Sequence, residues 1–357
     1  MTGLDEKLRR LIDAVGPISI ADYMSLVLSD PEYGYYTTHT AIGLEGDFIT
    51  APEISQMFGE LIGIWCVAAY EALGRPPQVT LAELGPGRGT LMADLLRAGR
   101  VDPGFIRAAE VHLVEISPEL RRRQAAALSG LASPVWHDRI DELPDGPLIV
   151  IANEFFDALP IRQYVNSERG WRERVVGLDD HGNLAFGIGA AAPDLALLPA
   201  GAADAPIGAV AEINRPAEAI VATLAHRLVR QGGAALIFDY GHVKSGFGET
   251  LQAVRSHHYA DPLSEPGECD LTAHVDFDRL AQAAVAEGAI VLGPITQGDF
   301  LVAMGLIERA GALGTGRGEE EQQNIVAAVE RLAGPEEMGT LFKAMAIAHP
   351  PMTLPGF

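Results

Sequence analysis

The chain has 357 residues, of which 48% are hydrophobic and 21% are charged, so it can form a buried core and about two domains. This composition excludes a chain that is disordered throughout. The 26 basic and 48 acidic residues leave a net charge of -22, which disfavours nucleic acid and anionic membrane surfaces as partners.

The two cysteines, Cys66 and Cys269, suggest neither a disulfide framework nor a zinc site, and we expect no metal. The N-terminal residues include Asp5 and Glu6 and lack an apolar stretch, unlike a secretory signal or a transit peptide. No apolar run approaches the roughly 18 residues that span a bilayer. We therefore expect a cytoplasmic protein that does not cross a membrane.

The N-terminal part of the chain has helical periodicity. Apolar residues recur at helical spacing over 4–28, with a break at Gly16-Pro17 that predicts two short helices. After a loop rich in glycine and aromatic residues, a third helix is expected around Phe58 to Trp65. Residues 1–74 are thus predicted to form a helical cap.

From residue 75 onward, short β-type runs alternate with helical stretches. Such alternation is typical of an α/β fold with a doubly wound, mostly parallel sheet, which we place at 75–162 and 207–310. The expected strands are 79–84, 111–115, 134–136, 148–152 and 234–239, and the expected helices are 90–99, 117–128 and 216–230.

An insertion over 163–206 interrupts this core after its fourth strand. Runs at 163–165, 171–178 and 184–188 predict antiparallel ribbons, and 189–206 is low in complexity, as in an exposed, mobile loop. Two further β-type runs are expected near 289–292 and 300–304. Residues 311–357 are then predicted to form two helices and a tail.

A glycine-rich loop stands where the first core strand ends. Gly85, Gly87 and Gly89 occupy its first, third and fifth positions, whereas a dinucleotide fingerprint needs glycine at the first, third and sixth. Glu83 lies two residues before the first glycine. The spacing therefore weakens the interpretation of a nicotinamide-dependent dehydrogenase.

This loop resembles motif I of class I S-adenosylmethionine-dependent methyltransferases, which have a Rossmann-like sheet. The resemblance implies that the loop contacts the methionine part of the cofactor and that Glu115, after the second strand, binds the ribose hydroxyls. A carboxylate suits a diol because it offers two acceptor oxygens. The alternative is that Glu115 caps the helix beginning at Ser117. Asp138 is the candidate for the adenine amine, and Asn153 is a further cofactor candidate.

Two acids follow the fourth core strand. Glu154 and Asp157 lie in a loop that should face the transferable methyl group of the cofactor, because ligands of doubly wound sheets bind at the carboxyl ends of the strands. They are the candidate catalytic residues, suited to a basic nucleophile. The alternative is an ordinary helix N-terminus capped by Asn153. Glu212 and His242 are weaker candidates.

Five longer blocks resemble the MidA-like methyltransferase family, which includes a mitochondrial complex I assembly factor that methylates arginine. The blocks are Gly46–Glu60, the glycine loop, Asn153–Pro160, Phe238–His242 and Asp270–Phe277, and the resemblance runs over about residues 17–307. It implies symmetric dimethylation of an arginine in a protein substrate. Methylation of a small-molecule amine or hydroxyl remains an alternative, as does a non-catalytic assembly factor that keeps the fold.

An arginine substrate would explain why two carboxylates stand at this place in the sequence. A guanidinium stays protonated at physiological pH, so it is a poor nucleophile until acids orient it. Glu154 and Asp157 can do so by bidentate hydrogen bonding.

Overall fold

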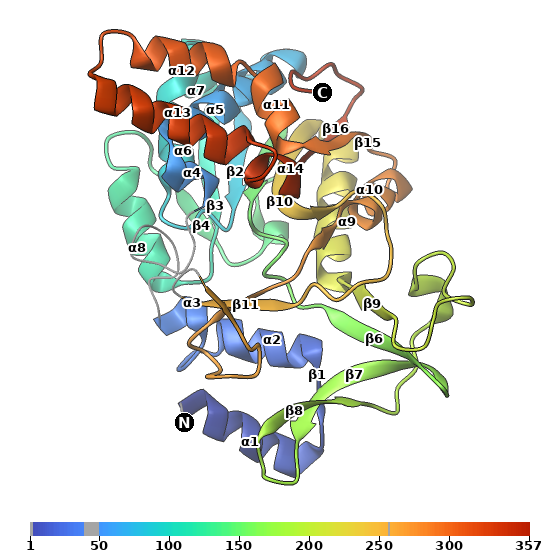
Figure 1. The fold of residues 1–357 in the computed structure, drawn as a ribbon. Helices are drawn as coiled ribbons and strands as arrows, with labels where there is room; N and C mark the ends of the chain where they lie inside the picture. The colour runs from blue at the N-terminus through green and yellow to red at the C-terminus, as the bar shows by residue number, and fades with distance from the viewer. Residues whose placement is uncertain (1–2, 39–49, 256–257) are drawn as a thin grey trace. The chain divides into compact units, whose positions relative to one another are not determined.

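A computed structural model describes residues 3–38, 50–255 and 258–357 (Figure 1). The described chain divides into two compact units. The larger unit contains residues 49–156, 219–243 and 277–357, and the smaller unit contains residues 1–48, 157–218 and 244–276. Among the described residues, no helix has both the length and the apolar character needed to cross a bilayer.

The larger unit is built on a mostly parallel sheet with the strand order β15-β16-β10-β5-β2-β3-β4. The parallel strands are β2 (Val79–Leu84), β3 (Ala109–Val114), β4 (Val135–His137), β5 (Leu148–Asn153) and β10 (Gly233–His242). Two antiparallel strands, β15 (Ile290–Thr296) and β16 (Phe342–His349), extend the sheet beyond β10. Every residue of β2 and β5 is buried, as a central parallel strand requires.

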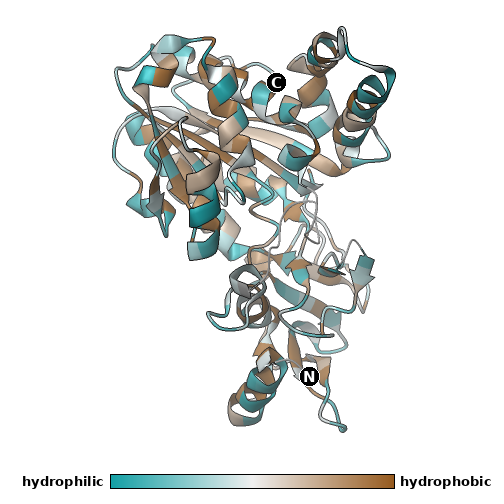
Figure 2. Cartoon of the chain, turned by 90° about the vertical axis from the view of Figure 1, so that its left-hand side faces the viewer, coloured by the Kyte–Doolittle hydropathy of each residue, from teal (hydrophilic) through white to brown (hydrophobic). Residues whose placement is uncertain are grey.

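Helices flank this sheet. They are α4 (Ala51–Ile54), α5 (Gln56–Ala72), α6 (Thr90–Gly99), α7 (Pro103–Ala108), α8 (Pro118–Ala127), α9 (Arg215–Gln231), α10 (Phe277–Ala286), α11 (Gln297–Ala303), α12 (Leu306–Gly314), α13 (Glu319–Ala333) and α14 (Met338–Leu341), with the short 3-10 helix η1 (Ile140–Glu142). Phe58 of α5, Phe238 of β10 and Phe300 of α11 pack edge to face, with ring centroids 5.2 and 5.1 Å apart. Figure 2 shows the apolar colour concentrated on the central strands.

The smaller unit combines helices with antiparallel ribbons. Its elements are α1 (Gly3–Val15), β1 (Ile18–Ser19), α2 (Ile20–Ser29), α3 (Tyr35–Thr38), β6 (Arg162–Ser167), β7 (Gly170–Leu178), β8 (Leu184–Ile188), η2 (Leu195–Leu197), β9 (Val210–Ile213), β11 (Gln252–Arg255), β12 (His258–Ala260), β13 (Asp270–Thr272) and β14 (Val275–Asp276). Its largest apolar cluster joins Leu4 and Leu8 of α1, Tyr23 of α2 and Leu271 of β13. The two N-terminal helices and the three ribbon strands confirm the sequence predictions.

Two expectations need correction. Residues 300–304, expected as a strand, belong to the end of α11, because the Thr296 side chain caps that helix by accepting from the Asp299 amide at 3.1 Å. The tail contains the strand β16 in addition to helices. The stretch 189–206 is largely exposed, but Trp171 anchors it, donating from its indole Nε1 to the carbonyl of Ala202 at 3.0 Å.

The start of β10 depends on a glycine. Gly233 has φ +151°, and a Cβ atom there would lie 2.1 Å from the carbonyl oxygen of Leu148 and 2.7 Å from a methyl group of Leu228. We therefore expect Gly233→Ala to lower the free energy of unfolding by roughly 2–4 kcal/mol, measured by urea denaturation. In the control Gly288→Ala, φ is +89° but the space is open. An equal loss in both variants would contradict the steric explanation.

Candidate active site

The candidate residues stand where the parallel strands end. In the sheet, Glu83 of β2 is level with Ile151 of β5, and Asn153 of β5 is level with Phe238 of β10. The glycine loop follows β2, Glu115 follows β3 and Glu154 follows β5. Because these strands are parallel, their carboxyl ends meet at one edge of the sheet, which is where α/β folds bind their ligands.

The glycine loop has a backbone that side chains rarely adopt. Gly85, Gly87 and Gly89 have φ of +59°, +52° and +84°. A Cβ atom on Gly85 would come within 2.9 Å of the ring of Phe155, and one on Gly89 would come within 3.2 Å of the Gln124 Cα. The predicted loop therefore needs its glycines for backbone angle and for close approach.

Glu83 is buried beneath this loop, with 3% of its surface exposed. It accepts a hydrogen bond from the Met92 amide, but its Oε2 has no partner among the described residues. Burial raises the pKa of this carboxyl to about 8. The Oδ1 atom of Asn153 is also buried and has no partner in the described part of the chain. Buried polar atoms without a partner are uncommon, and both suit a polar ligand that supplies the missing hydrogen bond.

Glu115 is held firmly at the end of β3. Its Oε1 accepts from the Ser117 amide at 2.8 Å, and its Oε2 accepts from Nε2 of Gln124 at 3.1 Å. The same Gln124 nitrogen donates to the carbonyl of Gly87 at 2.8 Å. Burial raises the pKa of the Glu115 carboxyl, while the hydrogen bonds to Ser117 and Gln124 oppose that shift. The bond to Ser117 supports a capping role, and each oxygen keeps a second acceptor site for a ribose hydroxyl.

Asp138 follows β4 in a more open setting. Its side chain is 68% exposed and pairs with Arg121 at 2.5 Å. Arg121 also donates from Nε to the carbonyl of Glu115 at 2.8 Å, which links the ends of β3 and β4. The assignment of Asp138 to the adenine amine stays a prediction.

Glu154 has a backbone conformation that is uncommon for a residue with a side chain, with φ +51°. Its amide donates to the carbonyl of Phe238 at 2.9 Å. Its Oε1 accepts from the amide of Ala51 and from Nδ2 of Asn153, each at 3.0 Å. The carboxylate is thus fixed in direction from the first residue of α4 and from the end of β5.

A contact that the sequence did not predict joins α4 to the glycine loop. Glu53 accepts from the hydroxyl of Thr90 at 2.6 Å, and its other oxygen lies 3.5 Å from the guanidinium of Arg88. Residues 46–49 of the same sequence block lie outside the described residues. The short helix α4 therefore connects the glycine loop with Glu154 inside the larger unit.

Asp157 belongs to the smaller unit and is 7% exposed. Its carbonyl accepts from the amide of Ala273 at 3.0 Å. Nearby, the hydroxyl of Tyr36 donates to Asp270 at 3.0 Å. Burial raises the pKa of Tyr36 well above its ordinary value, and the charges of Asp270 and Asp157 add to the shift. Tyr36 and Asp270 were not predicted as neighbours of Asp157, although both lie in sequence segments that stood out.

Glu212, the weaker candidate acid, is engaged by its own unit. Its Oε1 accepts from Nε2 of Gln163 at 2.7 Å and from the amides of Thr250 and Leu251 at 2.9 and 3.2 Å. Its Oε2 accepts from the hydroxyl of Thr250. These bonds tie β9 to the start of β11, which favours a structural role.

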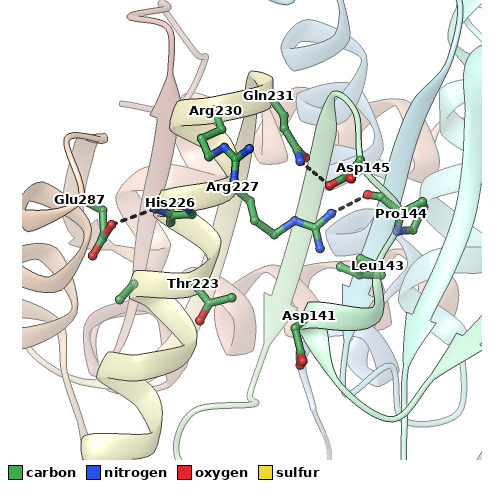
Figure 3. Close-up of a pocket in the computed structure, with 11 residues that line it drawn as sticks. Asp141, Leu143, Pro144, Asp145, Thr223, His226, Arg227, Arg230, Gln231 and Glu287 are labelled. Carbon is green, nitrogen blue, oxygen red and sulfur yellow. Dashed lines mark hydrogen bonds and ion pairs between the residues drawn. The ribbon is translucent and has the colours of Figure 1, made fainter.

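A pocket of about 630 Å³ opens at the opposite edge of the sheet (Figure 3). It is lined by residues from 141–145, which precede β5, and from 222–231, which precede β10. Two pairs of its polar side chains bond to each other, Gln231 with Asp145 at 2.6 Å and His226 with Glu287 at 3.2 Å, and Arg227 donates to the carbonyl of Ile140 at 3.2 Å. Because the pocket lies at the amino ends of the parallel strands, it is separate from the glycine loop.

The buried Glu83 predicts a pH dependence of stability. Its folded-state pKa of about 8 exceeds the ordinary value of 4.5 for a glutamate, so between these pH values the folded chain binds a proton that the unfolded chain has lost. Stability from this group therefore falls as pH rises from about 5 to about 8. Glu83→Gln has no ionisable group at this position, so its stability does not fall with pH for this reason. The free energy of unfolding of the variant should therefore gain on that of the wild type as pH rises, by at most about 1.4 kcal/mol per pH unit.

The measurement is urea denaturation of the cofactor-free protein at several pH values. The control is Glu110→Gln, since Glu110 of β3 is exposed and its carboxyl stays in water. A difference between Glu83→Gln and wild type that does not change with pH would show that Glu83 is already ionised in the folded protein.

The residues present fit S-adenosylmethionine, the cofactor that the glycine loop implies. Glu83 and Asn153 each offer a buried polar atom that has no partner within 3–38, 50–255 and 258–357, suited to a polar ligand. Glu115 offers a fixed carboxylate for ribose hydroxyls, and the glycine loop lets the backbone approach closely.

Comparisons with known proteins identify the family and its cofactor. Residues 61–295 match the family described as S-adenosyl-L-methionine-dependent methyltransferase. The chain is 39% identical to "Protein arginine methyltransferase NDUFAF7, mitochondrial" of Danio rerio, with 95% of this chain and 85% of the relative covered. The human protein of the same name is 36% identical, with coverages of 94% and 81%.

A solved structure supports the same assignment. The crystal structure of a Burkholderia thailandensis protein bound to S-adenosyl-homocysteine is 30% identical, covers 99% of this chain and 93% of its own, and has a TM-score of 0.83. A second crystal structure from that organism has a TM-score of 0.81 and 32% identity, with coverages of 97% and 91%. The fold is thus that of a class I methyltransferase, and the chain belongs to this family of S-adenosylmethionine-dependent methyltransferases.

Proposed function

We propose that this methyltransferase acts on an arginine side chain of a protein substrate. The observation that carries the proposal is the similarity, over nearly the whole chain, to relatives named protein arginine methyltransferase. Symmetric dimethylation and a part in respiratory complex I assembly belong to the same proposal, and they rest on the family resemblance. The expected cytoplasmic location and the absence of nucleic acid partners stay predictions.

The cofactor supplies an electrophilic methyl group on a sulfonium. The residues of this chain have to bind a guanidinium, align one nitrogen with that methyl group and accept the proton that the nitrogen loses. We assign these tasks to Glu154 and Asp157. Two carboxylates can hold a guanidinium by charge-assisted hydrogen bonds and draw its positive charge away from the attacking nitrogen.

The fixed direction of the Glu154 carboxylate supports this assignment. Its bonds to Ala51 and Asn153 leave little freedom for the side chain to reorient when a substrate arrives. A preorganised charge is more effective in catalysis than one that must first move.

The direct test is incubation with labelled S-adenosylmethionine and a lysate of the source organism. Mass spectrometry of the labelled protein should place the methyl groups on arginine. For an arginine that carries two methyl groups, fragmentation that releases monomethylamine indicates the symmetric product. Label found only on a small amine or hydroxyl compound would refute the proposal in favour of a different nucleophile, and no label at all would favour an assembly factor without catalysis.

The two acids give a sharper prediction. In Glu154→Gln and Asp157→Asn the shape is retained but the charge is lost, so methyl transfer to arginine should fall by roughly two or more powers of ten. Binding of S-adenosyl-homocysteine, measured by calorimetry, should persist. The control is Asp180→Asn, in the exposed turn between β7 and β8. Full transfer by both acid variants would show that the guanidinium is held elsewhere.

The cofactor site gives a separate prediction. Glu115→Ala removes charge-assisted bonds to the ribose, so the affinity for S-adenosyl-homocysteine should weaken by about 1–3 kcal/mol in calorimetry. Glu119→Ala, on the first turn of α8, is the control for a lost acid nearby. Unchanged affinity of a folded Glu115→Ala protein would indicate that Glu115 only caps α8.

A further inference from the structure

The buried carboxylate of Asp239, on β10, lies at the same level in the sheet as Glu154, which follows the neighbouring strand β5. The parallel pairing of β10 with β5 ends at Phe238 and Asn153, so Asp239 is the next residue along on β10, as Glu154 is on β5. The two strands are direct neighbours in the sheet. Asp239 has none of its surface exposed to solvent. A buried acid needs strong hydrogen-bond partners to be tolerated.

Asp239 finds those partners in the backbone that follows Glu154. Its Oδ2 accepts from the amides of Phe155 and Phe156 at 3.2 and 2.9 Å, and its Oδ1 accepts from the amide of Tyr240 at 3.0 Å. Phe155 and Phe156 lie beyond the end of β5, where their amides no longer pair with the carbonyls of a neighbouring strand. The carboxylate of Asp239 accepts these hydrogen bonds instead.

These bonds fix the unusual turn at Glu154. The carbonyl of Phe238 holds the amide of Glu154, and Asp239 holds the next two amides. A residue other than glycine at φ +51° is strained, and this conformation persists only when its surroundings hold it. The same bonds seat the ring of Phe155 against the glycine loop, where a Cβ on Gly85 would be 2.9 Å away.

We propose that Asp239 is a positioning residue for methyl transfer, which acts by holding residues 154–156 so that the Glu154 carboxylate keeps its direction. The inference rests on the proposed role of Glu154. The three bonds described above run from Asp239 to backbone amides, so removing it should impair the chemical step more than the binding of the cofactor.

The test is Asp239→Asn. An amide side chain has one acceptor oxygen, so it cannot serve the three amides that the carboxylate serves. With labelled S-adenosylmethionine and the protein that the wild type labels, kcat should fall at least tenfold. KM for that protein and the dissociation constant of S-adenosyl-homocysteine should each change less than threefold. Asp94→Asn, which removes another buried acid of the larger unit, is the matched control and should keep kcat.

Two further readouts separate positioning from general destabilisation. If Asp239 acts through Glu154, the double variant with Glu154→Gln should be no slower than Glu154→Gln alone. Hydrogen exchange of the Phe155 and Phe156 amides should accelerate at least tenfold in Asp239→Asn, with exchange in β2 unchanged. If Asp239→Asn does not fold, Asp239→Glu keeps both oxygens but displaces them, and it should give the same pattern.

The outcomes distinguish this inference from the proposed function. Independent, multiplicative losses in the double variant, an unchanged kcat, or unchanged exchange of the two amides would each overturn the role of Asp239. A Glu154→Gln protein with full activity would instead refute the proposed role of Glu154. In that case the exchange of the two amides still decides whether Asp239 holds the loop.

Discussion

The parallel pairing of β10, β5, β2 and β3 is the constraint on which the candidate site depends. These strands are almost wholly buried, so their backbone groups must pair with one another and cannot exchange partners with water. A slip of one residue would turn every side chain to the other face of the sheet. The register therefore fixes the level at which Glu83, Asn153 and Asp239 stand, before any of their side chains makes a bond.

The elements closest to this constraint were the most predictable from sequence. The strand β2 and the helix α6 have the predicted bounds, because a uniformly apolar run followed by glycines and a helical pattern leaves few alternatives. The strand β16 was missed, since Phe342–His349 is rich in alanine and contains a lysine, which carry little β-type signal. Its strand conformation comes from the partners β10 and β15 on its two sides.

Some features of the candidate site could likewise be predicted from the sequence, and others could not. The glycine spacing and the acids at positions 83 and 115 could be predicted, because each stands at a fixed offset from a strand end. The bond between Glu53 and Thr90 could not, since the two residues are 37 positions apart and no local pattern records their contact. The same holds for the amides that Asp239 binds, 83 and 84 positions away. Sequence patterns therefore predict the residues expected to contact the ligand better than they predict the residues that hold these side chains in position.

The place of β16 has a consequence for how the protein is made. This strand lies between β10 and β15, so neither of those has its full set of backbone partners until residues 342–349 are available. During synthesis, β10 emerges from the ribosome about a hundred residues earlier and would expose an unpaired, apolar edge for all that time, on the order of ten seconds at typical translation rates. Until then, the unpaired edge of β10 can associate with other chains.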